Sequence, residues 1–308
     1  MPRTRGFKGV VLAEMQPDSG AFPSKPRIDV VRERLNALKA EELVLEEELR
    51  TLESSSRQTP LSFSASSSAA PLQPVQKIAL FLDLFGARRS VYPKLWENPK
   101  TAKKGYAPAC HNEWRPGICR KPQIKCTDCA HQKFPPLDEN AIEAHLRGTH
   151  AIGTYAIRED DSCIFLAADF DGEGWQDDAQ AYSRAGSHAG VTVALERSRS
   201  GAGGHAWIFF SEPVPSVLAR KLGSILLAKA ASSQPAMPLH AYDRFFPNQD
   251  TMPAGGFGNL IALPLAKAPR DRGNTVFLGA DLKPVPDQWE FLRAVHRLSR
   301  DELDLILV

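Results

Sequence analysis

The segment Ile164-Phe165-Leu166-Ala167-Ala168-Asp169-Phe170-Asp171 is an apolar run that ends in two carboxylates separated by one residue. A short apolar run of this kind predicts a buried strand. Since side chains alternate along a strand, Asp169 and Asp171 should project from the same face, a few ångströms apart. Two such charges repel unless a cation neutralises them, and hard oxygen ligands favour Mg²⁺ or Mn²⁺. The segment therefore predicts a metal-binding strand end; for a lone Asp-x-Asp pair, the alternative is a solvated turn.

Further strand and helix patterns surround this segment. Residues 151–157 and 162–170 are predicted to form a hairpin around the turn at residues 159–161. Other predicted strands are 191–196, 205–210, 259–265 and 275–278, and helical spacing begins at Lys77 and recurs at 217–231 and 287–298. The mixture predicts an α+β fold with a mainly antiparallel sheet.

The segment from Glu196 to Trp207, ERSRSGAGGHAW, combines glycines with basic and hydroxyl side chains. Glycines allow backbone N–H groups to approach phosphate oxygens closely, and the nearby side chains add charge and donors. We therefore predict a triphosphate cradle; a plain hairpin turn and a core histidine are the alternatives. The candidate nucleotide-binding residues here are Arg197, Arg199, Ser200, Gly201, Gly203 and His205.

A third carboxylate for the metals is expected downstream. Asp243 and Asp250 are both candidates, and each could instead be a turn residue or a helix cap. Arg244 and Asn259 are added as candidate nucleotide-binding residues.

Four of the five cysteines lie within twenty residues, in the pattern C-x8-C-x6-C-x2-C. Four thiolates close a tetrahedral zinc site without an open position, so we predict a structural zinc knuckle at residues 106–134 with Cys110, Cys119, Cys126 and Cys129 as ligands. His111 or His131 could replace one cysteine, and unligated core cysteines are the remaining alternative.

The cysteines lie in a basic stretch. Between Arg88 and Lys133 there are eleven Lys or Arg residues and three acids. Zinc would fold this stretch and hold its basic side chains against a phosphate backbone, whereas a solvated basic face is the alternative. The candidate template-binding residues are Arg88, Arg89, Lys103, Lys104, Arg120 and Lys121.

Composition limits the possible partners and cellular location of the protein. The 308 residues carry a formal charge of +2, which does not by itself indicate a nucleic-acid partner. No segment has the length of a signal peptide core or a membrane helix, so we expect a cytoplasmic protein without membrane contact. Clustered cysteines in a reducing compartment also favour metal ligation over disulfides.

The N-terminal quarter has a different pattern. Residues 1–26 are expected to be an irregular leader, 27–53 a heptad helix and 54–76 a Ser/Pro-rich linker, before a catalytic domain at 77–300. Apolar residues repeat every seven positions at Val31, Leu38, Leu45 and Leu52, with Ile28, Leu35 and Leu49 on the alternate seam. This coiled-coil stripe could mediate homo-oligomerisation through residues 28–52, bind a partner or dock on the domain.

Together these blocks resemble a known family. The order of an Asp-x-Asp strand end, S-G-x-G-x-H before a strand, and an acid before N-L-I-A-L-P is similar to the three motifs of archaeo-eukaryotic primases. The blocks ERSRSGAGGHAWIFF, YDRFFPNQD and GGFGNLIALPL resemble the primase-polymerase domain of TOTE conflict systems and of CRISPR-associated primase-polymerases. The resemblance spans about residues 77–292, including the cysteines.

The resemblance implies a fold and a set of roles. The expected fold has an RRM-like antiparallel palm bearing the acids, a second α/β portion, a small zinc-binding insertion and the N-terminal coiled-coil-like helix. Asp169 and Asp171 would bind two catalytic metal ions, and His205 with Ser200 would contact the phosphates of an incoming NTP or dNTP. In archaeal primases a hydrophobic-Asp motif precedes a segment similar to Leu260-Ile261-Ala262-Leu263-Pro264. The spacing of that motif implies Asp250 as the third metal ligand, whereas Asp243 has the hydrophobic neighbour, Tyr242, that the motif describes. Ala262 stands where archaeal primases carry a basic residue, and Arg244 could substitute for it. Helicase or nuclease modules would act as partners.

The leading hypothesis is a template-dependent DNA or RNA primase-polymerase, an enzyme that transfers nucleotides on a single-stranded template. A metal-dependent nuclease is an alternative, because clustered acids also cut phosphodiesters. A zinc-bearing, non-catalytic module that binds single strands is the third hypothesis.

Overall fold

A computed structural model describes residues 29, 31–41, 44, 70–233 and 239–308, which divide into two units at Ala70 and Pro71. In the first unit, the described residues 29, 31–41 and 44 are helical, and Val31, Leu35 and Leu38 are exposed. The other heptad positions, the leader and most of the linker lie outside the described residues. Coiled-coil pairing therefore stays a prediction.

The second unit is built on a central sheet whose middle strand is the apolar segment. Strand β4 (Ser162–Asp171) lies between β6 (Gly203–Pro215) and β7 (Tyr242–Phe246), and β5 (Ala194–Arg197) pairs with the far edge of β6. These four strands are antiparallel, and the short β9 (Arg297–Leu298) pairs in parallel with β6. β4 is apolar on both faces because helices cover both sides of the sheet.

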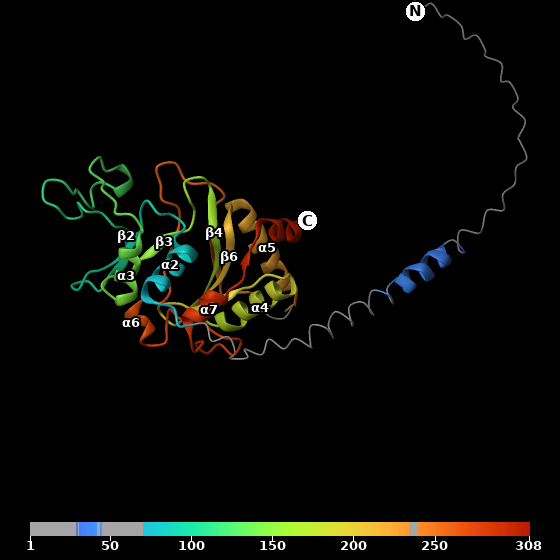
Figure 1. Cartoon of the computed structure of the whole chain (residues 1–308). Coiled ribbons are helices and arrows are strands. Elements are labelled where there is room, and N and C mark those ends of the chain that lie inside the picture. The colour runs from blue at the N-terminus through green and yellow to red at the C-terminus, as the bar shows by residue number, and fades with distance from the viewer. Residues whose placement is uncertain (1–28, 30, 42–43, 45–69, 234–238) are drawn as a thin grey trace, which may run out of the picture. The chain divides into compact units, whose positions relative to one another are not determined.

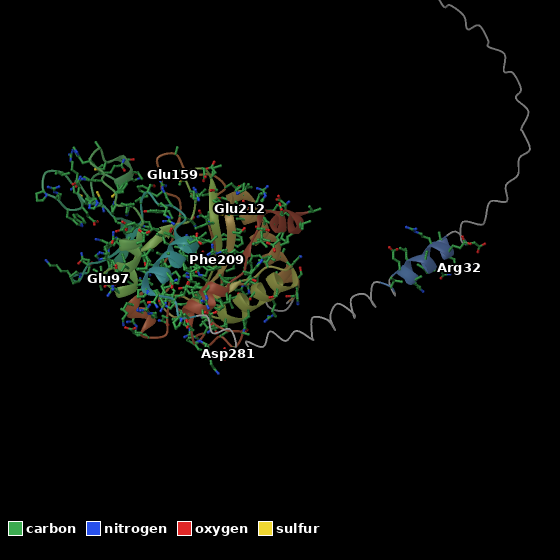
Figure 2. The ribbon with its side chains drawn as sticks, in the orientation of Figure 1. Arg32, Glu97, Glu159, Phe209, Glu212 and Asp281 are labelled. Carbon is green, nitrogen blue, oxygen red and sulfur yellow. The ribbon has the colours of Figure 1, made fainter. Side chains whose placement is uncertain are left out.

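The alternation of β4 assigns its side chains to these two sides. Helix α2 (Pro74–Phe85) covers one face, and helices α4 (Trp175–His188) and α5 (Ser216–Ser233) cover the other (Figure 1). Phe165 packs on Trp207, which meets Phe85 of α2, while Phe170 packs on Tyr182 of α4. Phe209 lies in the interior of this body (Figure 2).

A second group of strands stands beside this sheet. The hairpin of β1 (Pro93–Glu97) and β2 (Lys104–Pro108) is antiparallel, and β3 (Gly153–Tyr155) pairs with β8 (Leu260–Ala262). The predicted hairpin of 151–157 with 162–170 is therefore wrong. Both edges of β4 are occupied by β6 and β7, so the chain turns at residues 158–161 and passes into a different sheet.

The buried His145 fastens this second group to the helix before it. His145 belongs to α3 (Glu139–Arg147); its Nε2 lies 2.8 Å from the carbonyl of Pro264, and its Nδ1 accepts from the amide of Ile152 at 3.2 Å. Burial lowers the pKa of His145 to about 4, so a neutral imidazole holds the chain before β3 to the chain after β8. These two segments border the cleft described below.

The remaining elements are the 3-10 turn η1 (Cys126–Asp128) and the helices α6 (Lys267–Arg270), α7 (Gln288–Ala294) and α8 (Arg300–Leu307). The prediction of mixed helices and antiparallel sheet is confirmed. Helix α4 was not predicted, because WQDDAQAYSRAGSH offers only small or polar residues around Trp175 and Tyr182. None of the helices in the described part of the chain is both long and apolar enough to span a bilayer.

Candidate active site

A row of four charged side chains crosses the central sheet at the end of β4. Asp169 lies opposite His205 on β6 and opposite Arg244 on β7, and His205 lies opposite Glu196 on β5. The row therefore alternates acid, base, acid, base across neighbouring strands, an arrangement that opposite charges stabilise. Asp171 lies two residues further along β4, on the same face as Asp169.

The row opens into a cleft of about 470 Å³. Asp169, Asp171 and His205 form its floor, together with the loop residues Ser198, Arg199 and Ser200. Lys104 of β2 and Arg272, which follows α6, line it from the second group of strands and the chain after them. The cleft thus combines carboxylates with hydroxyl, imidazole and cationic donors, which suits an anionic substrate that carries or binds metal.

Glu196 fixes the orientation of His205. The Glu196 carboxylate is buried and accepts from the indole N–H of Trp207 at 2.9 Å, while the Nδ1 of His205 lies 2.8 Å from the same oxygen. The opposite ring nitrogen, Nε2, lies 3.6 Å from a carboxylate oxygen of Asp169. Burial alone would lower the pKa of His205, but the negative charge of Glu196 and of the cleft acids raises it above its ordinary value.

Asp169 is a poorly solvated carboxylate. Burial, with smaller contributions from the charges of Asp171 and Asp243, raises the pKa of Asp169 from its ordinary value of 3.8 to about 6. His205 and Arg244 oppose this rise. At neutral pH the charge of Asp169 is therefore only partly compensated, and a bound cation would stabilise it.

The glycines of the predicted cradle have separate roles. Gly201 has a φ of +81°, which an L residue rarely adopts, and its amide donates to the Ser198 carbonyl in a tight turn. Gly203 instead lies in β6 opposite Asp171, and a Cβ there would stand 2.2 Å from an oxygen of Asp171. The absence of a side chain at Gly203 therefore leaves room for the Asp171 carboxylate at the floor of the cleft.

Two of the predicted nucleotide-binding residues, Arg197 and Asn259, form hydrogen bonds to the backbone and do not line the cleft. Arg197 donates to the carbonyls of Gly273 and Leu282, and Asn259 donates to the Phe245 carbonyl while its side-chain oxygen accepts from the backbone. Both hold loops in place. The structure brings Arg199, Ser200 and His205 to the cleft, and Arg199 lies 5.9 Å from the ring centre of Tyr106.

The two candidates for the third acid lie in different places. Asp243 precedes Arg244, pairs with it at 2.7 Å, and contributes to the field at Asp169. Asp250 forms an ion pair with Arg220 of α5.

The position of Asp250 follows from the chain around it. The amide of Met252 donates to Asp161, which immediately precedes β4. Eight residues of strand separate Asp161 from Asp169, about 26 Å at ~3.3 Å per residue. Asp243 thus lies close enough to Asp169 to affect its pKa, whereas Asp250 lies near the opposite end of β4.

The four clustered cysteines line one small cavity of about 20 Å³ together with His131 and Lys121. Burial raises the pKa of Cys126, Lys121 opposes this, and Cys110 and Cys119 add to it, so these thiols are near neighbours. Cys163 is fully buried in β4. Among the residues that the structure describes, no three His, Cys, Asp or Glu side chains are already arranged around a metal position.

The six predicted template-binding residues do not form one surface patch. Arg88 pairs with Glu159 and Arg89 caps α2 through the carbonyls of Leu82 and Gly86. Lys104 lines the cleft, whereas Lys121 pairs with Glu113 at 2.9 Å. Lys103 and Arg120 are exposed.

Comparison with known families identifies the chain. Residues 76–306 match the archaeo-eukaryotic primase domain of TOTE conflict systems, so the chain belongs to this family. At the level of the family it is a primase-polymerase, a nucleotidyltransferase. A similar solved structure is the polymerase domain of ligase D from Mycobacterium tuberculosis in complex with DNA, with 18% identity and a TM-score of 0.38 over 75% of this chain and 84% of that chain. No curated protein matches.

The sequence did not single out Glu196, the buried acid behind His205, or Arg272 of the cleft wall. Glu196 begins the quoted glycine-rich block, and its place in a strand opposite His205 follows only from the β5–β6 register. Arg272 lies in the basic run Lys267-Ala268-Pro269-Arg270-Asp271-Arg272, and this cluster of charges before Gly273 was a signal that could have found it.

Replacing Glu196 by Gln should lower the pKa of His205. The substitution removes the charge that opposes the effect of burial, so the imidazole loses its proton at a lower pH than in the wild type. The measurement is a titration of the histidine ring signals by NMR. Glu212→Gln, an exposed change on the same strand as His205, is the control, and an unchanged His205 titration in Glu196→Gln would contradict this role.

Asp169→Asn should stabilise the metal-free protein at pH 7.5. The folded-state pKa of about 6 lies above the ordinary 3.8, so the carboxylate opposes folding once it is charged. A difference of this size corresponds to at most about 3 kcal/mol. The gain should shrink as the pH falls through 6 towards 4, as read from denaturant unfolding in EDTA.

The control for this experiment is Glu173→Gln, an exposed change two residues beyond Asp171. It should leave the free energy of unfolding within about 0.5 kcal/mol of the wild type. An Asp169→Asn protein that is less stable than the wild type at pH 7.5 would show that Asp169 is already fully compensated without metal.

Proposed function

We propose that this chain is a template-dependent primase-polymerase that joins nucleotides on a single strand, with divalent ions held by Asp169, Asp171 and Asp243. The observation that carries the proposal is the cross-sheet row, which sets a partly compensated carboxylate beside an imidazole in a cleft with phosphate-binding groups. Membership of the primase family supports the same reaction class.

The donors of the cleft fit Mg²⁺ or Mn²⁺. Carboxylate oxygens are hard ligands, and the raised pKa of Asp169 marks a position where positive charge is needed. Asp171 would supply further oxygens from the cleft floor, and Asp243 of β7, which does not line the cleft, would have to turn away from Arg244 to join them. When bound, two such ions would activate the attacking hydroxyl and stabilise the leaving pyrophosphate.

The protein groups around the metals bind and orient the triphosphate. Glu196 raises the pKa of His205 and so favours its protonated form, whose Nε2 would donate to a phosphate oxygen in the cleft. Ser200 and Arg199 add donors from the glycine turn, and Lys104 and Arg272 do so from the facing wall. Charge on the transferred group is thereby met by fixed cations and dipoles, which is the main route to catalysis in phosphoryl chemistry.

Asp243 is the proposed third acid, in place of the sequence-based preference for Asp250. Its contribution to the field at Asp169 supports the choice, as does the ion pair that holds Asp250 to Arg220. Arg244, its neighbour in the row, would be displaced from Asp243 towards phosphate when the metals bind.

We also propose that Cys110, Cys119, Cys126 and Cys129 bind a structural Zn²⁺. The four thiols share one small cavity in a segment with little regular structure, and thiolates are preferred zinc ligands. Bound zinc would order the segment and lower the pKa values of the thiols.

Primer synthesis tests the catalytic proposal. The wild-type protein should form dinucleotides and longer products from NTPs or dNTPs on a single-stranded template with Mn²⁺ or Mg²⁺. Asp169→Ala and Asp243→Ala should each reduce the rate at least ~100-fold, because metal binding supplies several kcal/mol of transition-state stabilisation. Asp250→Ala, which removes an equivalent exposed carboxylate at the other end of β4, should stay close to wild type.

Two outcomes would overturn this assignment. A folded, metal-loaded protein that forms no product on any template, or an Asp169→Ala variant as active as wild type, would exclude polymerase activity at this site. Strand cleavage without synthesis would favour the nuclease alternative. A larger loss in Asp250→Ala than in Asp243→Ala would return the third-acid role to Asp250.

Zinc content tests the structural site. The wild-type protein should retain about one zinc per chain after purification without added metal, and Cys129→Ser should lose it together with thermal stability. Cys163→Ala, a change of the buried cysteine in β4, should retain zinc. Zinc-free wild-type protein, or full zinc in Cys129→Ser, would contradict the proposed ligands.

A further inference from the structure

A second groove lies next to the active-site cleft and carries two exposed tryptophans. It is about 680 Å³ in volume and runs between the β1–β2 hairpin and the cysteine-rich segment 110–134. Trp96 and Trp114 line it with 43% and 67% of their surfaces exposed. Among the Phe, Tyr and Trp side chains in the part of the chain that the structure describes, no other is exposed to this degree. Two such rings on one groove mark a binding surface.

Trp96 is held in place by the strand opposite it. Its partner across the hairpin is Gly105, and a Cβ at Gly105 would lie 3.0 Å from the Trp96 ring. The indole therefore lies flat over the glycine backbone and turns its other face towards the groove. A ring fixed in this way loses little conformational freedom when a planar ligand stacks on it.

Trp114 is exposed, on a constrained backbone and next to a cation. Its φ of +59° is rare for a bulky residue and persists only where the surroundings determine it. The ammonium group of Lys121 lies 5.8 Å from the centre of its ring, and Glu113 pairs with Lys121. One part of the indole thus contacts a cation and the rest is open to the groove.

The charge around the groove favours a polyanion. Residues 93–134 contain nine Lys or Arg and three acids, a formal charge of +6 over 42 residues in a chain whose total is +2. Lys100 and Lys121 line the groove itself, with Glu97 and Glu113 beside them. Basic side chains interleaved with stacking platforms are the pattern of single-strand nucleic-acid binding.

The hairpin separates this groove from the active-site cleft. Trp96 faces the groove, while its neighbour Leu95 lines the cleft with the acids, as alternation along β1 requires. Glu97, at the surface of the body in Figure 2, borders both cavities. A nucleic-acid strand bound along the groove would therefore be separated from the carboxylates of the cleft only by the β1–β2 hairpin.

We propose that this groove binds single-stranded nucleic acid by stacking unpaired bases on Trp96 and Trp114. The groove is the entry path for the template, with Lys100 and the surrounding basic residues on the phosphates. This inference rests on the proposed polymerase function for the identity of the strand as template. The stacking itself requires neither metal nor nucleotide.

Binding of a fluorescein-labelled oligothymidylate, long enough to cover a site of ~4–16 nucleotides, tests the groove by fluorescence anisotropy without metal or nucleotide. Trp96→Leu and Trp114→Leu should each weaken binding about tenfold, whereas Trp96→Phe and Trp114→Phe should retain most of it because a ring remains. Lys100→Ala should reduce the slope of log affinity against log salt by about 0.7. An excess of duplex should compete poorly, because its bases are already stacked.

The matched control is Val217→Ala, which truncates an exposed apolar side chain at the start of α5. It should bind like the wild type, and thermal melts should show that every variant is folded. Leu variants that bind like wild type, or Phe variants as weak as the Leu variants, would overturn the stacking proposal.

Synthesis assays on the wild type separate this result from the catalytic proposal. If binding depends on the tryptophans but the protein makes no product, the single-strand binding groove is supported and the polymerase function is contradicted. If the protein synthesises product but both Trp→Leu variants bind the oligonucleotide like the wild type, the polymerase function is supported and the proposed groove is contradicted. Capture of a protein partner through the same tryptophans, without oligonucleotide binding, would overturn the proposed occupant.

Discussion

One electrostatic constraint organises this molecule: the carboxylate of Asp169 stands at the end of a strand that is otherwise buried and apolar. β4 lies between two strands and beneath helices on both faces, so water reaches Asp169 poorly and its pKa rises to about 6. His205 and Arg244 lie opposite Asp169 on the two neighbouring strands, and both lower its pKa against the effect of burial. The negative charge of Asp169 is only partly compensated by these two side chains, and a bound divalent ion would stabilise it further.

The same constraint explains why Glu196 is buried. Burial lowers the pKa of His205, and the negative charge of Glu196 on the next strand opposes this effect and helps to raise it above its ordinary value. Trp207 donates to that carboxylate and belongs to the aromatic cluster that packs under α2. Core packing, the ionisation of His205 and the field in the cleft are thus linked through one row of side chains. The fold that gives this family its nucleotidyl transfer is also the source of that field.

Local rules predicted part of this arrangement. Apolar length and alternation were enough to predict β4, the shared face of its two acids and α5. The pairing of β3 with β8 was not predictable, because a strand that is apolar on both faces does not indicate which sheet it joins. The position of Asp250 depends on the direction in which β7 passes β4, and the use of Arg197 depends on carbonyls about 80 residues away. Such contacts are set by tertiary structure.

The most direct test is to locate Mn²⁺ by anomalous scattering in crystals of the full chain grown with an unreactive nucleoside triphosphate. We expect anomalous density between the carboxylates at the end of β4 and Asp243, with the triphosphate within hydrogen-bonding reach of the ring nitrogen of His205. Density that lies at Asp250 or elsewhere, with the acids of β4 unoccupied, would contradict the assignment of this row as the catalytic centre.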